Sequence, residues 1–120
     1  MSVSPDAIPM DTYEFVLLRR TPQYGDFDEE HRERIFREHL GHTRAMVASG
    51  RQLAAGPITD SPAGDSPICG FGLFQHGSLD TVRRLMEADP GVRQGLYCFD
   101  VMTWRTPAGL VTFRTAPAPA

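Results

Sequence analysis

Two segments near opposite ends of the chain, residues 13–20 and 95–105, are apolar at consecutive positions instead of alternate ones. Four consecutive apolar side chains lie in the first segment: Phe15, Val16, Leu17 and Leu18. The second carries apolar side chains on both of its faces, with Tyr97, Phe99 and Val101 on one and Leu96, Cys98, Met102 and Trp104 on the other. Successive side chains of a strand point to opposite faces, so strands with this pattern are buried on both. The fold must therefore cover both faces of its sheet.

The other periodicities and turn signals predict the order of the elements. Strands are expected over residues 13–20, 51–55, 68–76 and 95–105, an extra short strand over 110–114, and helices over 28–49 and 79–88. This order is that of the ferredoxin-like split β-α-β arrangement, an α+β fold with an antiparallel sheet and both helices on one face. Two helices cover only that face, so we expect a homodimer in which a second copy covers the other.

The length of 120 residues is enough for one domain with a core of its own. We expect this domain to span residues 12–115. A flexible N-terminal arm over residues 1–11 precedes it, and a disordered tail over residues 116–120 follows it.

Composition excludes several classes of partner and reaction. The formal net charge of −3 and the lack of a basic, aromatic-rich segment predict no nucleic-acid partner, and no apolar run approaches the roughly 20 residues that cross a bilayer. The N-terminal residues lack the features of a signal peptide, so we expect a cytoplasmic protein with Cys69 and Cys98 as reduced core thiols. All 12 basic residues are arginine, so this chain cannot form a lysine Schiff base.

The helix predicted over residues 28–49 places a titratable side chain, His39, beside its apolar stripe. The stripe consists of residues at helical spacing: Ile35, Phe36, Leu40, Thr43, Met46 and Val47. An imidazole exchanges protons near neutral pH, so His39 either makes a structural hydrogen bond or takes part in chemistry. His42 lies three residues further on, but no third ligand falls at a motif spacing, so we expect no metal site.

Two acidic and two aromatic residues are further candidates. Asp89 precedes a proline, so it either ends the second helix or orients an imidazole. Asp100 lies inside an apolar strand, and because a lone buried charge is costly it either faces solvent or belongs to a site. Tyr97 and Trp104 are candidates for lining a substrate pocket, although aromatic side chains in strands more often belong to the core.

Three motifs follow one another along the chain: His39-Leu40 in the first helix, Gly56-Pro57 after the second strand, and Asp89-Pro90 with Gly95 five residues after the proline. In combination they resemble the YCII-related (YciI-like) family over residues 13–113. The resemblance implies a dimeric α/β barrel, in agreement with the two-faced strands. By position, it also implies that His39 and Asp89 form the histidine–aspartate pair of a pocket.

The leading hypothesis is a cofactor-free enzyme acting on a small organic molecule, aromatic or cyclic compounds included. His39 would be the general acid/base and Asp89 its orienting partner, in an elimination, isomerisation or hydrolysis. Tyr97, Asp100 and Trp104 would contact the substrate. Two alternatives stay open: a non-catalytic ligand-binding or accessory homodimer, in which the pair is structural, and a small cofactor-independent monooxygenase.

Overall fold

The computed structural model describes residues 8–62 and 67–113. Most of the predicted N-terminal arm and the whole predicted C-terminal tail lie outside the described residues. The elements are β1 (Met10–Arg20), the 3-10 helix η2 (Tyr24–Asp26), α1 (Glu29–Ala48), β2 (Ala54–Pro57), β3 (Ile68–Phe74), α2 (Leu79–Glu87), α3 (Pro90–Arg93) and β4 (Tyr97–Pro107). Residues 110–113 form no strand, so the described part of the extra strand that we predicted is absent.

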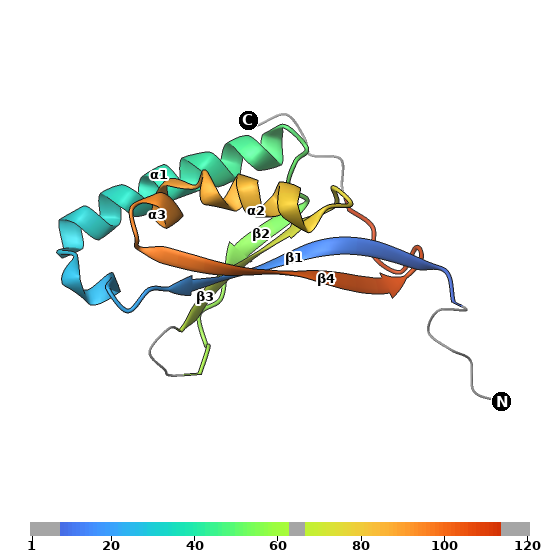
Figure 1. Cartoon of the computed structure of the whole chain (residues 1–120), viewed down its shortest axis with the longest axis horizontal. Coiled ribbons are helices and arrows are strands. Elements are labelled where there is room, and N and C mark those ends of the chain that lie inside the picture. Colours follow the sequence, from blue (N-terminus) through green and yellow to red (C-terminus); the bar gives the residue numbers. More distant parts are fainter. Residues whose placement is uncertain (1–7, 63–66, 114–120) are drawn as a thin grey trace.

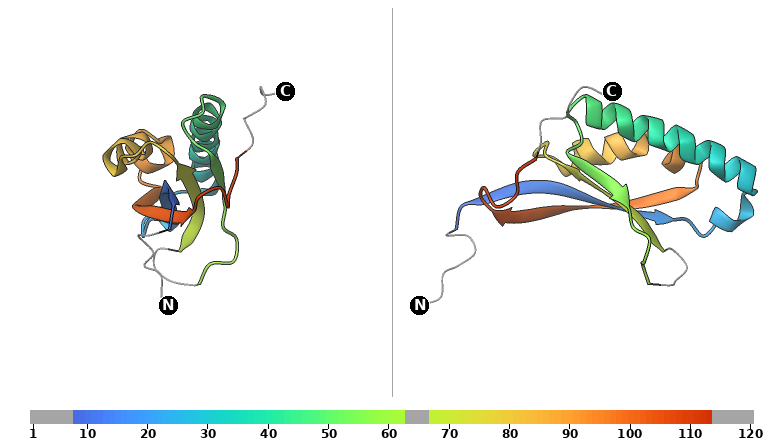
Figure 2. Two further views of the ribbon diagram at one scale, coloured as in Figure 1. Left: turned by 90° about the vertical axis from the view of Figure 1, so that its right-hand side faces the viewer. Right: turned by 180° about the vertical axis from the view of Figure 1, so that it is seen from behind.

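The four strands form one antiparallel sheet in the order β2-β3-β1-β4. The long strands β1 and β4 pair along their whole length, from Met10 opposite Pro107 to Arg20 opposite Tyr97. Both long helices lie on the same face of this sheet (Figures 1 and 2). The structure therefore confirms the predicted α+β, ferredoxin-like arrangement. No helix among the described residues is both long and apolar enough to cross a membrane.

Side-chain caps fix where the helices begin. Asp28 accepts a hydrogen bond from the backbone N–H of His31 at 2.7 Å, and Ser78 accepts one from Thr81 at 3.1 Å. The short helix α3, which we did not predict, begins directly after Asp89. Its first residue is Pro90, whose fixed φ suits a first helical position and whose missing N–H needs no partner there.

The core lies between the helices and the face of the sheet toward them. Its buried members come from all the long elements: Val16, Leu18, Ile35, Met46, Phe74, Val82, Met86, Leu96 and Tyr97. Cys69 packs against this core, as predicted, but Cys98 is exposed on the other face. The prediction of two core thiols was therefore wrong for Cys98, because the alternation of β4 turns its side chain away from the helices.

We call the other side of the sheet the open face. Cross-strand pairs place its apolar residues together: Tyr13, Phe15, Leu17, Phe71, Leu73, Met102 and Trp104. The rings of Phe15 and Phe71 stack at 5.8 Å, and those of Tyr13 and Trp104 lie 5.5 Å apart. No helix of the described residues covers this face (Figure 2).

Candidate active site

A cavity of about 840 Å³ lies between α1 and the sheet. Helix α1 packs against α3, while α2 and α3 pack against β4. Strand β3 widens the space because Gly70 and Gly72 pair with Leu18 and Val16 and bring no side chain to the helix-facing side. This volume falls in the range of small-molecule binding sites.

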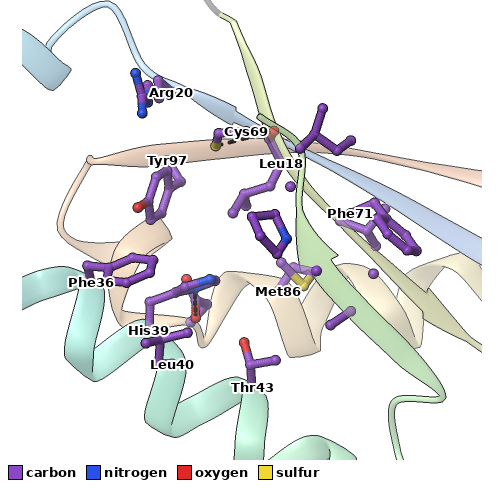
Figure 3. A pocket seen from close by; sticks show the side chains of 18 of the residues that line it. Leu18, Arg20, Phe36, His39, Leu40, Thr43, Cys69, Phe71, Met86 and Tyr97 are labelled. Atoms are coloured by element: carbon purple, nitrogen blue, oxygen red, sulfur yellow. Dashed lines mark hydrogen bonds and ion pairs between the residues drawn. The ribbon is translucent and has the colours of Figure 1, made fainter. Parts of the chain in front are cut away.

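His39 points from α1 into this space, together with Leu40 and Thr43 (Figure 3). Its Nδ1 lies 2.8 Å from Oδ1 of Asp89, a residue 50 positions further along the chain. The His39 side chain is 14% exposed, whereas that of Asp89 is completely buried. The structure thus brings together the two residues that the family resemblance paired.

Local structure around Asp89 explains why its carboxylate is held in place. Its second oxygen, Oδ2, caps α3 by accepting a hydrogen bond from the backbone N–H of Val92 at 3.2 Å. Asp89 follows directly after the C-cap residue of α2, as its interpretation as a helix-terminating residue predicted. Its side chain contacts the imidazole with one oxygen and caps α3 with the other. Because a carboxylate only accepts hydrogen bonds, Nδ1 of His39 donates, and Nε2 carries the lone pair when the ring is neutral.

Aromatic rings flank the imidazole of His39. The Tyr97 ring centroid lies 5.3 Å from that of His39, and the Phe36 centroid lies 6.2 Å away. Burial raises the pKa of the Tyr97 hydroxyl well above its ordinary value, so the phenol is neutral throughout the physiological range. Phe36 is 44% exposed although it belongs to the predicted apolar stripe, because this part of α1 faces the cavity.

The other candidate residues lie elsewhere. Asp100 and Trp104 are on the open face and do not line the cavity, since alternate residues of β4 point to opposite sides of the sheet. Asp100 instead pairs with Arg19 at 2.9 Å. Of the three residues predicted to contact substrate, only Tyr97 is on the cavity wall.

The side chain of His42 does not share a site with that of His39. Its Nε2 lies 3.2 Å from the backbone carbonyl oxygen of Leu85. Among the described residues, no three His, Cys, Asp or Glu side chains are grouped as metal ligands would be.

Several polar residues of the cavity wall escaped prediction. Arg20, Tyr24 and Arg32 come together from β1, η2 and α1. Gln52 is only 5% exposed and lies over Gly72, where an added Cβ would be 2.5 Å from its Nε2. These residues carry no recognisable motif, because their positions depend on contacts between distant segments. The Gly-Phe-Gly run of β3 was the nearest signal, since glycines in a strand mark close approach.

Comparisons with known proteins agree with this architecture. A similar solved structure is the 5-chloro-2-hydroxyhydroquinone dehydrochlorinase from Burkholderia phenoliruptrix AC1100, in complex with 2,5-dihydroxybenzoquinone. The sequence identity is 18% and the TM-score 0.54, over 81% of this chain and 95% of that chain, so the likeness is one of fold. A comparison with curated proteins finds no match. The model of the YCII-related domain matches residues 14–105, so the chain belongs to the YCII-related family.

Proposed function

We propose that this protein is a cofactor-free enzyme that acts on a small organic molecule, aromatic or cyclic compounds included. His39 is its general acid/base and Asp89 the residue that orients the imidazole. The observation that carries this proposal is the 2.8 Å contact between Nδ1 of His39 and the buried carboxylate of Asp89, with the ring on the wall of a cavity. A histidine with a purely structural role needs no such cavity beside it.

The hydrogen bond at Nδ1 prepares the opposite ring nitrogen for proton transfer. Nε2 takes a proton from an acidic C–H or from water, and the Asp89 carboxylate stabilises the imidazolium that forms. In an elimination, the C–H electron pair becomes a double bond as the leaving group departs with its own pair. In an isomerisation, the imidazolium returns the proton to another carbon. A positioned acid/base contributes roughly 10²–10⁴-fold, which suits substrates with an acidic C–H or a good leaving group.

The similar dehydrochlorinase supports elimination as the first reaction to test, because loss of HCl belongs to that class. The shared fold alone does not carry over its substrate. The proposal for this chain therefore rests on the His39–Asp89 pair and the cavity.

We also propose that the protein is a homodimer, with the open faces of two copies packed against each other. The apolar side chains of this face are the support for that proposal, since Met102 and Trp104 remain 38% and 37% exposed in one chain. Pairing of the sheets would complete the dimeric α/β barrel that the family resemblance implies.

The test is turnover of a panel of small cyclic compounds by the wild type and by His39→Gln. The panel contains chlorinated hydroquinones, followed by chloride release, and unsaturated lactones, followed by absorbance. His31→Gln is the matched control, since His31 lies on the same helix but not on the cavity. We expect His39→Gln to lose turnover while His31→Gln keeps it. Equal turnover by a folded His39→Gln protein would overturn the proposal, and binding without turnover would favour a ligand-binding dimer.

A further inference from the structure

Two arginine side chains meet at one end of the cavity. Arg20 is the last residue of β1, and Arg32 lies in the first turns of α1. Both guanidinium groups lie over the ring of Tyr24, with Cζ 4.5 Å from the ring centroid for Arg20 and 5.1 Å for Arg32. All three side chains line the cavity, and we call them the arginine subsite. Stacking on a shared ring restrains both guanidinium groups and leaves their N–H donors available.

No carboxylate of the described residues forms an ion pair with either arginine of the subsite. Arg32 donates one hydrogen bond, to the backbone carbonyl oxygen of Tyr24 at 3.4 Å. Two glutamates also line this end of the cavity, but Glu33 pairs with Arg37 at 2.5 Å and Glu29 contacts neither arginine as an ion pair. The two guanidinium groups therefore outweigh the one carboxylate without a cationic partner.

The charge of this end of the cavity acts on the groups further inside. Burial raises the pKa of the Tyr97 hydroxyl and of the Cys69 thiol, and the positive charge of Arg20 works against that rise in both cases. Tyr97 is in turn the ring beside His39. Arg20, Tyr97 and His39 thus surround the same space (Figure 3).

We propose that the arginine subsite binds an anionic group of the substrate, a carboxylate or an oxyanion of similar planar shape. The ring or chain that bears this group then extends past Tyr97 toward His39. Guanidinium groups suit this role because their planar N–H donors match a carboxylate in geometry as well as in charge. That the bound molecule is a substrate rests on the proposed function, whereas binding of the anion does not.

Calorimetric titration with benzoate and benzamide tests this inference, because the two molecules share a ring but differ in charge. We expect the wild type to bind benzoate more tightly than benzamide. Arg20→Gln and Arg32→Gln should each weaken benzoate binding about tenfold or more, as expected for loss of a charged hydrogen bond, with little change for benzamide. Arg34→Gln is the control, because Arg34 is an exposed arginine of α1 that does not line the cavity.

Three results would overturn the inference. They are benzoate binding no tighter than benzamide, benzoate binding that is unchanged in folded Arg20→Gln and Arg32→Gln proteins, or equal weakening by Arg34→Gln. The thermal unfolding midpoint of each variant shows that it is folded. His39→Gln separates this test from the proposed function, since it should abolish turnover while keeping the preference for benzoate.

Discussion

At the scale of single residues, His39 shows what periodicity predicts and what it leaves open. The apolar stripe of α1 correctly predicted that this side chain faces inward, on the same side of the helix as Met46. Periodicity could not predict that the same face borders a cavity, because that depends on the distance between α1 and the strands. The position of Asp89 before a proline made it a candidate to orient an imidazole, but it lies 50 residues from His39, so only the family resemblance paired the two.

Asp89→Asn should change the position of the proton on the His39 ring. The amide oxygen of Asn can still cap α3, but its N–H₂ group donates toward Nδ1 and so favours the tautomer protonated at Nε2. Nitrogen-15 NMR of the imidazole at alkaline pH distinguishes the two tautomers. We expect Nδ1–H in the wild type, Nε2–H in Asp89→Asn, and no change in Asp80→Asn, an exposed control. An Nε2–H tautomer in the wild type would contradict the assigned role of Asp89.

The buried phenol of Tyr97 should make the protein sensitive to alkali. Its pKa is raised in the folded state, so above about pH 10 the unfolded chain releases this proton first. The associated stability is complete below that pH and is lost as the pH rises toward the raised pKa. Urea unfolding across this range should therefore show a smaller alkaline loss for Tyr97→Phe than for the wild type. Tyr13→Phe is the control, and equal losses in all three proteins would contradict the expectation.

At the scale of elements, α3 is where the sequence prediction was least complete. The Asp-Pro pair was correctly interpreted as the end of α2, but the four residues after it form a separate helix. So short a helix shows no periodicity of its own, and its stability depends on the Asp89 cap and on packing. The longer elements were predicted to within a few residues because their apolar patterns extend over several turns or pleats.

Gly91 of α3 makes room for the aromatic wall of the site. A Cβ at this position would lie 2.5 Å from Cδ2 of Tyr97 and 3.0 Å from Oδ2 of Asp89. We therefore expect Gly91→Ala to lower the free energy of unfolding by about 1–3 kcal/mol, as overpacking of a core does. Gly41→Ala is the matched control. Gly41 is an exposed residue of α1, and nothing lies within 4 Å of a Cβ added there.

Urea unfolding followed by circular dichroism measures both glycine variants. The control Gly41→Ala should be more stable than the wild type by up to about 1 kcal/mol, because alanine is a better helix former than glycine. An unchanged stability for Gly91→Ala would mean that Tyr97 can move aside, and it would argue against a rigid wall at this side of His39.

At the scale of the whole molecule, the open face is the main feature that one chain leaves unexplained. Two-faced strands predicted that both sides of the sheet would be covered, and the described elements cover only one. The second face stays uncovered because two helices suffice for only one face of a four-stranded sheet. The arginine subsite could not be predicted for a related reason, because it joins three elements that meet only in the folded chain.

Met102→Arg should shift the proposed dimer toward monomer. Met102 lies on the open face opposite Phe15, on the edge strand β4, and a charge buried there between two sheets would be costly. Sedimentation equilibrium at micromolar concentration should show a dimer for the wild type and a folded monomer for the variant. Ala45→Arg, on the exposed side of α1, should remain dimeric. A wild type that sediments as a monomer would contradict the proposal.

Chemical rescue of His39→Ala tests the central claim, proton transfer by this ring, most directly. The substitution leaves a gap on the wall of the cavity, where free imidazole can enter. On a substrate found with the panel above, we expect His39→Ala to lower kcat by roughly 10²–10⁴-fold. Added imidazoles should then restore turnover to an extent that depends on their pKa. Full turnover by folded His39→Ala protein, or a loss that no imidazole restores, would contradict the account.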